Sequence, residues 1–180
     1  MIDAMTALNA CRDDSDANSK PLFDVVQAGS DDLTSVLAVD QQSFLKTDWW
    51  NEDLWRGFLK STGSRVLLAR SKVDLDPILG VVVFERGGKL MKIAVVPSGR
   101  CCGVGAGLLG AALFVLDGEF RRSCCSLHVE PTNSVAIKLY TRRGFKQDCV
   151  VCDYYGPGRH AWRMLRERCD DRCEGVTDSL

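Results

Sequence analysis

The chain has 180 residues, 46% of them hydrophobic, which suits one domain with a substantial buried core. Its net charge of −1 and pI near 6.1 show none of the basic excess that most nucleic-acid-binding proteins carry. No apolar run approaches the roughly 18–20 residues of a membrane-spanning helix, and the acidic segment 1–20 does not resemble a secretory signal or transit peptide. We therefore expect a cytoplasmic or nuclear protein that binds neither nucleic acid nor membranes.

Nine cysteines are many for this length, and we expect free thiols in a reducing compartment. Two pairs, Cys149-x-x-Cys152 and Cys169-x-x-x-Cys173, superficially resemble a zinc ribbon. The first pair falls in a predicted strand, where residues three apart point to opposite faces, and the second falls in a polar tail. We therefore predict no metal site.

The first half of the chain predicts a flexible arm followed by a strand, two helices and three strands. The arm covers residues 1–20, which are polar and lack periodicity. The three later strands are joined by short turns, at 74–77 and 87–88, so an antiparallel meander is expected. The predicted elements are a strand at 22–27, a helix from a cap at Ser30 or Asp31 to about Phe44, a helix at 51–59, and strands at 65–70, 78–85 and 89–96.

The second half alternates helices and strands, and it ends in a hairpin across Gly156-Pro157-Gly158. Asn133 is a predicted helix N-cap, and Gly144 suits the left-handed residue that follows a helix. The expected fold is α/β (α+β), with a mixed, mostly antiparallel sheet of about seven strands flanked by about four helices. The domain should cover residues 21–167, followed by a polar tail at 168–180; its later elements are a helix at 103–120, a strand at 124–130, a helix through Arg143, and strands at 145–155 and 160–166.

A glycine-rich turn, Arg100-Cys101-Cys102-Gly103-Val104-Gly105, separates a predicted strand from a predicted helix. Unpaired amides and the helix dipole make such a helix start an anion site. Gly103, Gly105 and Gly107 carry no side chain that would keep a pyrophosphate away, and Arg100 adds positive charge. The turn alone is also compatible with a plain strand-to-helix connection. A dinucleotide-binding fold is disfavoured, because it would place the turn in an early parallel β-α-β unit.

Together with Ala94-Val95-Val96-Pro97 before it, this turn resembles the pyrophosphate-binding signature of the GCN5-related N-acetyltransferases (GNAT). Later motifs resemble the protein N-terminal acetyltransferases of that superfamily, of the bacterial ribosomal-protein alanine and eukaryotic NatE types. These motifs are Leu127-His128-Val129-Glu130-Pro131-Thr132-Asn133, Ala136-Ile137-x-Leu139-Tyr140, Gly144-Phe145, Tyr154-Tyr155 and Ala161-x-x-Met164. The resemblance covers about residues 22–167. It implies the GNAT fold, acetyl-CoA as donor, a protein or peptide N-terminus as acceptor, direct attack in a ternary complex, and auxiliary subunits as candidate partners.

The resemblance also implies roles for individual residues. A peptide α-amine, with a pKa near ~8, needs only a weak base, and His128 would order a water that accepts its proton. Tyr140 would contact the coenzyme sulfur and act as general acid. The implied coenzyme-binding residues are Ile93, Val95, Val96, Arg100, Cys101, Cys102, Gly103, Val104, Gly105, Ala106, Asn133, Ala136 and Tyr140. The implied substrate-binding residues are Phe44, Met91, Tyr154 and Tyr155.

Strand alternation places Ser126, His128 and Glu130 on one face, so a half-buried, merely hydrogen-bonded histidine is the plainer interpretation of His128. Two features depart from the family pattern. Lys89 occupies the position where the NatE type has a catalytic tyrosine, and the segment 44–50 replaces one that contains proline.

These departures keep two alternatives open. The first is an acetyltransferase for a small amine or a lysine side chain, because Glu130 or Asp153 would suit a cationic substrate. The second is a catalytically inactive coenzyme-A-binding subunit.

Overall fold

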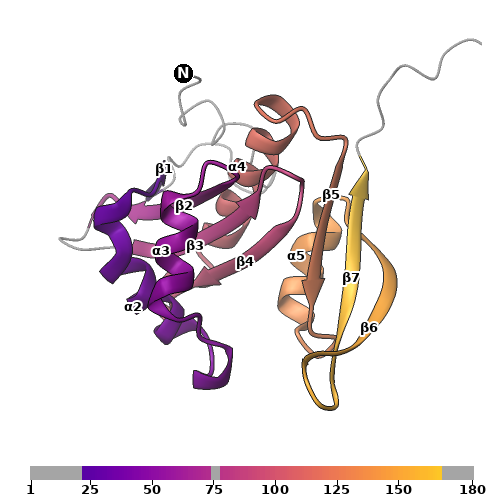
Figure 1. Cartoon of the computed structure of the whole chain (residues 1–180). Helices are drawn as coiled ribbons and strands as arrows, with labels where there is room; N and C mark the ends of the chain where they lie inside the picture. Colours follow the sequence, from indigo (N-terminus) through magenta and orange to yellow (C-terminus); the bar gives the residue numbers. More distant parts are fainter. Residues whose placement is uncertain (1–21, 74–77, 168–180) are drawn as a thin grey trace, which may run out of the picture.

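The computed structural model describes residues 22–73 and 78–167. The predicted arm at 1–20, the turn at 74–77 and the tail at 168–180 lie outside these residues. The element order confirms the prediction, with small differences at the ends (Figure 1). The elements are β1 (Phe23–Gln27), α2 (Leu33–Ser43), α3 (Glu52–Lys60), β2 (Ser64–Ser71), β3 (Ile78–Glu85), β4 (Leu90–Val95), α4 (Val104–Gly118), β5 (Cys124–Val129), α5 (Ser134–Arg142), β6 (Lys146–Gly156) and β7 (Arg159–Glu167), with short 3-10 turns η1 (Ser30–Asp32), η2 (Lys46–Asp48) and η3 (Pro97–Gly99).

The seven strands of the described residues form two antiparallel sheets, where we had expected one central sheet. The first has the order β1-β2-β3-β4 and the second the order β5-β7-β6. They meet at a parallel bridge between Lys89 and Ser126, where the Ser126 amide donates to the Gly88 carbonyl over 2.8 Å. Gly88 has a φ of 91°, and a β-carbon there would collide with the Cys124 carbonyl, so glycine permits this contact. Beyond the bridge β4 and β5 diverge, which opens the sheet (Figure 1).

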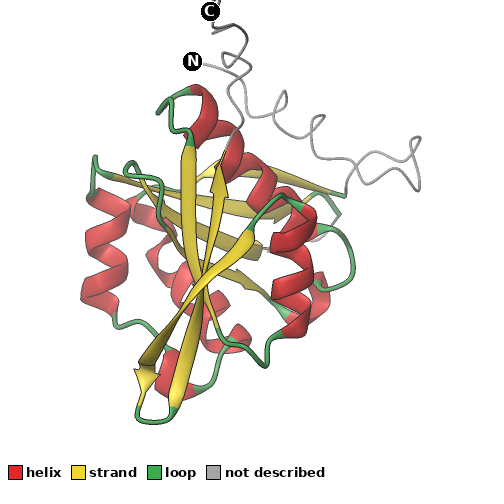
Figure 2. Ribbon diagram, turned by 90° about the vertical axis from the view of Figure 1, so that its right-hand side faces the viewer, coloured by secondary structure: helices red, strands yellow, loops and turns green. Residues whose placement is uncertain are grey.

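Helices cover both faces of the first sheet (Figure 2). The uninterrupted apolar run of β3 follows from this arrangement, because its successive side chains enter two different cores. Val81 and Val83 pack with Trp55 on the side of α2 and α3, whereas Val82 and Phe84 pack with α4. The α4 core continues into the second sheet, so one set of apolar contacts holds the two sheets together. No helix within 22–73 and 78–167 is long and apolar enough to cross a bilayer.

The helix ends confirm two of the features predicted from the sequence and contradict a third. The Asn133 side chain accepts a hydrogen bond from the Ala136 amide over 3.1 Å, which confirms the predicted cap of α5. Gly144 follows α5 with a φ of 85°, also as predicted. The caps predicted at Ser30 and Asp31 are wrong, because the chain enters α2 through η1. There the Asp32 carboxylate accepts from the Gly29 amide over 2.9 Å.

Candidate active site

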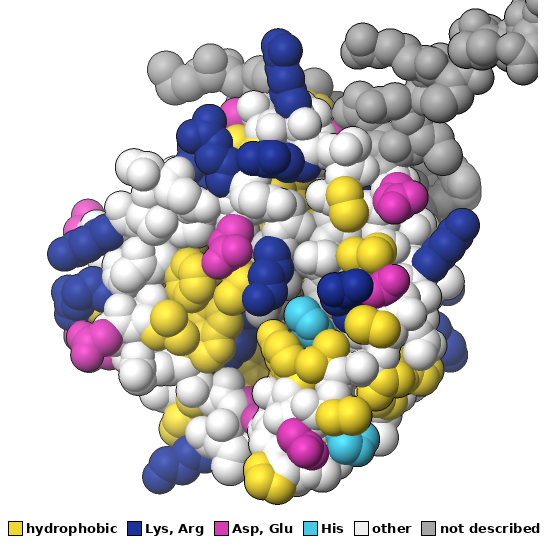
Figure 3. Space-filling model, turned by 45° about the vertical axis from the view of Figure 1, so that its right-hand side comes forward, with side chains coloured by type: hydrophobic (Ala, Val, Ile, Leu, Met, Phe, Trp, Pro, Cys, Tyr) yellow, Lys and Arg dark blue, Asp and Glu magenta, His cyan; other side chains and the backbone are white. Residues whose placement is uncertain are grey.

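A cavity of about 540 Å³ opens where β4 and β5 diverge. Its walls come from these two strands, α5, the β6–β7 hairpin and the segment between α2 and α3. Figure 3 shows hydrophobic side chains on either side of a hollow in this face of the molecule. Nine of the residues singled out in the sequence line it: Phe44, Met91, Ile93, His128, Asn133, Ala136, Tyr140, Tyr154 and Tyr155.

A bulge shapes the β4 wall of the cavity. Val83 pairs with Lys92 and Phe84 with Leu90, so Met91 is an extra residue without a partner in the ladder. Such a bulge bends its strand and leaves backbone groups free. Met91, which lines the cavity, therefore lies at a break in an otherwise regular antiparallel pair, and residue types alone did not indicate this break.

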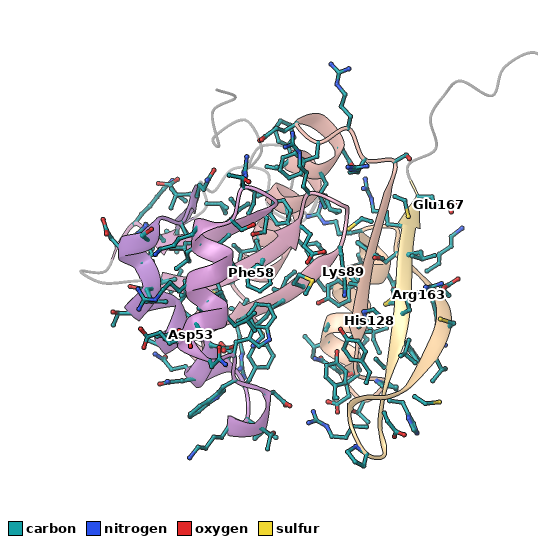
Figure 4. All side chains as sticks on the ribbon, viewed as in Figure 1. Asp53, Phe58, Lys89, His128, Arg163 and Glu167 are labelled. Atoms are coloured by element: carbon teal, nitrogen blue, oxygen red, sulfur yellow. The ribbon has the colours of Figure 1, made fainter. Side chains whose placement is uncertain are left out.

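His128 lies on β5, with its ring stacked on Tyr154 at a centroid distance of 4.3 Å and an interplanar angle of 13°. Its Nδ1 atom is buried and has no hydrogen-bond partner among the described residues. Burial lowers the pKa of His128, and the positive charges of Lys89 and Arg163 lower it further (Figure 4). All three causes favour the neutral imidazole, which can accept a proton at pH 7.

Tyr140 lies on α5 and is almost completely buried, 7% exposed, with Phe145 edge-on to its ring at 5.9 Å. Burial raises the pKa of Tyr140 to about 12. The phenol therefore stays protonated at neutral pH and is a proton donor facing the cavity. Burial is the main cause that keeps the imidazole neutral and the phenol protonated.

The tyrosines of the hairpin reach the cavity because β6 carries a second irregularity. The ladder passes from Val151–Ala161 directly to Gly156–Arg159, and Asp153 between them takes a left-handed φ of 54°. Tyr154 packs on His128, and Tyr155 stands at 83° to Tyr154 with ring centroids 4.8 Å apart. Burial raises the pKa of both phenols, so both are hydrogen-bond donors.

The glycine-rich turn lies at the end of β4 and does not line the cavity. Cys101 and Gly103 have φ angles of 59° and 76°, and α4 starts at Val104 without a side-chain cap. The amides of its first turn therefore lack intrahelical acceptors. Arg100 is exposed and its Nε donates to the Val95 carbonyl over 3.2 Å. The exposed turn at Cys101–Gly103, followed by the partly exposed Gly105 and Ala106 in the first turn of α4, has the features of an anion site.

Two positions attributed to the anion site or the coenzyme also have a role in the core. A β-carbon on Gly107 would lie 2.8 and 2.9 Å from ring carbons of Phe23, so this glycine allows α4 to approach β1. Val96 is 5% exposed, and its amide already donates to the Leu79 carbonyl over 3.0 Å. The side chain of Val104 is fully buried, which leaves its amide as the group available to a ligand.

A buried ion pair that we had not predicted lies beside the cavity. The Lys92 ammonium donates to Asp40 over 2.6 Å and to the Asp48 carbonyl over 3.1 Å. It lies between the rings of Phe44 and Trp50, 4.5 Å from each centroid. Burial lowers the pKa of Lys92, although the two carboxylates oppose that effect. The one indication of this pair in the sequence was a lysine within the otherwise apolar strand 90–95.

Asp40 fixes the segment 44–50, which departs from the family pattern because it lacks a proline. Its second oxygen accepts from the Trp50 amide over 2.8 Å and from the Trp55 indole over 3.2 Å. Trp50 stacks on Phe58 at 5.0 Å, and the Trp49 indole donates to the Phe44 carbonyl over 2.9 Å. Trp50 is thereby a fixed wall of the cavity, whereas Trp49 remains 36% exposed.

Arg159 joins three walls at the mouth of the cavity. Its guanidinium donates to both oxygens of Asp48, over 2.8 and 3.1 Å, and to Glu130 over 2.9 Å. It also lies 5.5 Å from the centroid of the Tyr155 ring. Asp153, by contrast, accepts from the Gly158 amide within the hairpin and does not line the cavity.

In the described part of the chain, no group of three or more His, Cys, Asp and Glu residues could hold a metal ion. Cys149 and Cys152 are exposed free thiols on β6, and Cys101 and Cys102 are exposed free thiols on the glycine-rich turn. Cys169 and Cys173 lie outside the described residues.

Comparison with known proteins agrees with this architecture. An N-alpha-acetyltransferase of Sulfurisphaera tokodaii is 35% identical over 77 residues, 43% of this chain and 46% of that protein. The N-terminal acetyltransferase A complex catalytic subunit NAA10 of Arabidopsis thaliana is 31% identical over 83 residues, 46% and 43% of the two chains. The chain thus matches just under half the length of these relatives.

Solved structures share the fold at low identity. The ribosomal-protein-S18-alanine N-acetyltransferase of Escherichia coli superposes with a TM-score of 0.71 at 18% identity, over 88% of this chain and 99% of that one. The spermidine/spermine N-acetyltransferase SpeG of Vibrio cholerae gives 0.64 at 16% identity, over 81% and 92%. Residues 33–145 match the sequence pattern of the acetyltransferase (GNAT) family. The chain therefore belongs to the GNAT acetyltransferase family.

Proposed function

We propose that this protein transfers the acetyl group of acetyl-CoA to the N-terminal α-amine of a protein or peptide. The observation that carries the proposal is the cavity between β4 and β5, which brings together the neutral imidazole of His128 and the protonated phenol of Tyr140. Relatives named N-alpha-acetyltransferase support the choice of an α-amine.

The residues present fit coenzyme A. The uncapped start of α4, the left-handed residues Cys101 and Gly103, and the guanidinium of Arg100 suit a diphosphate. β4 is an edge strand of its sheet, so the backbone of Ile93 and Val95 can bond an extended ligand lying in the gap. The coenzyme, when bound, supplies the acetyl group as a thioester.

His128 and Tyr140 would divide the proton transfers between them. A peptide α-amine with a pKa near ~8 is partly neutral at pH 7, so a weak base is sufficient. The neutral imidazole of His128 takes the amine proton, directly or through a water, and Tyr140 gives its proton to the leaving sulfur. Tyr154 and Tyr155, on the hairpin that covers the same end of the cavity, hold the first residues of the peptide by their hydroxyl groups.

A peptide panel with acetyl-CoA tests the proposal, with mass spectrometry to locate the acetyl group. We expect acetylation of peptides with a free N-terminus and none of N-terminally blocked peptides that contain lysine. H128A and Y140F should each lower kcat by roughly 10²-fold or more, the usual contribution of a general acid or base. H160A is the matched control, because His160 is exposed on the hairpin and does not line the cavity. Acetylation of blocked lysine peptides alone, or unchanged turnover in both variants, would contradict the proposal.

A further inference from the structure

The mouth of the cavity contains both signs of charge in close pairs. Among the cavity-lining residues of the described chain, the charged side chains are Asp48, Lys92, Glu130 and Arg159. Lys92 is bound to Asp40, which lies behind it and is 1% exposed. The two lining carboxylates, Asp48 and Glu130, are both bound by Arg159. No carboxylate that lines the cavity is therefore left without a cation.

This pairing occupies both carboxylates and favours the charged form of Asp48. The hydrogen bond from Arg159 is the main cause that lowers the pKa of Asp48. The Arg159 side chain is 34% exposed and Asp48 23%, so these charges are only partly screened by solvent. Two-pronged donation by a planar guanidinium is a geometry that an ammonium cannot reproduce.

A cationic acceptor would need a cavity-lining carboxylate that is not already bound to a cation. A polyamine, or a peptide whose first side chain is lysine or arginine, carries a positive charge that must leave water on entering the cavity. An unpaired carboxylate would offset that cost, but here Arg159 already occupies both candidates, and Lys92 adds a second fixed cation nearby. Discrimination by such a repulsive element is as effective as added attraction to the preferred partner.

We propose that Arg159 is a specificity-determining residue, which excludes polyamines and peptides with a cationic first residue by occupying Asp48 and Glu130. The inference rests on the proposed function and narrows its substrate class to N-termini with an uncharged first side chain. A purely structural clamp between η2, β5 and the hairpin would behave differently, because its loss would weaken all substrates alike.

The test compares two peptides that differ only at the first residue, leucine or lysine, together with spermidine. Arg159→Met keeps the apolar stem and removes the charge, whereas Arg159→Lys keeps a charge without the planar fork. We expect Arg159→Met to raise the kcat/KM ratio of lysine-first to leucine-first peptide by roughly fivefold, the upper value for one partly exposed ion pair. Arg159→Lys should lie between it and the unaltered protein. Because each ratio is taken within one variant, partial misfolding cancels.

The triple variant D48N/E130Q/R159M separates the effect of the carboxylate charges from the effect of the space that the arginine leaves. It should return the ratio towards that of the unaltered protein, because it removes the carboxylates that Arg159→Met exposes. Equilibrium binding of the same peptides and of spermidine, by calorimetry, gives a readout without turnover. If the unaltered protein acetylates no peptide, the proposed function fails. The ratio of the binding constants of the lysine-first and leucine-first peptides then still tests the inference about Arg159. An unchanged ratio in Arg159→Met, or equal ratios in Arg159→Met and the triple variant, would overturn it.

Discussion

Replacing Lys92 by methionine is expected to destabilise the fold strongly, because it leaves a buried charge without its partner. The ammonium is 8% exposed and the Asp40 carboxylate 1%, with 2.6 Å between nitrogen and oxygen. Breaking such a pair costs about 3–5 kcal/mol of unfolding free energy. Asp40 keeps two donors, the Trp50 amide and the Trp55 indole, which favours the lower end of that range. At ~3 kcal/mol the melting temperature of a chain of this size should fall by roughly 6–12 °C.

Urea unfolding followed by circular dichroism and tryptophan fluorescence measures this effect, with the fluorescence reporting on Trp50 and Trp55. The double variant D40N/K92M removes both charges and should recover to within about 1 kcal/mol of the unaltered protein, since neutral replacements of buried pairs are tolerated. Lys138→Met, at an exposed position of α5, should stay within about 0.5 kcal/mol. If Lys92→Met costs less than about 1 kcal/mol, or the double variant is no more stable than Lys92→Met, the assignment of a buried pair is wrong.

Three further predictions concern the site and its support. His128 should titrate with a midpoint below 6.5 by NMR, and its contribution to stability, full above pH 6.5, should be lost as the pH falls from 6.5 towards that midpoint; a midpoint at or above 6.5 contradicts its burial. Gly107→Ala should cost about 1–3 kcal/mol by overpacking against Phe23, whereas Gly118→Ala, with open space, should be neutral or stabilising in the same unfolding assay. Arg100→Ala should raise the KM for acetyl-CoA several-fold with the peptide KM unchanged, and equal shifts of both would argue against a diphosphate contact.

The parts of the site that could be predicted are those set by local patterns. Alternation along β5 correctly placed Ser126 and His128 on one face, and the structure buries Leu127 and Val129 on the other. Asn133 caps α5 because its short polar side chain reaches the Ala136 amide three residues ahead. In both cases the pattern that decides the outcome lies within a few residues in the chain, so residue type and spacing are sufficient evidence.

Other features depended on contacts that spacing does not report. The structure gives Gly107 a packing role beside Phe23, and it gives Val96 a backbone hydrogen bond to Leu79. The chain gave no local signal for the bulge at Met91, because a bulge is defined by the partner strand rather than by its own residue. The left-handed conformation of Asp153 was not predicted either. It is tolerated because the Asp153 side chain accepts a hydrogen bond from the Gly158 amide.

Patterns along the chain were enough to predict the order of the elements, the glycine-rich turn, and the half-buried position of His128. The division of the sheet between β4 and β5 became visible in three dimensions alone, since it depends on a bridge between Lys89 and Ser126 beyond which the strands diverge. The tertiary structure also decided which charges meet: Lys92 lies 52 residues from Asp40, and Arg159 lies 111 residues from Asp48. Pairings at such separations follow from how the walls of the cavity are assembled, and no periodicity along the chain encodes them.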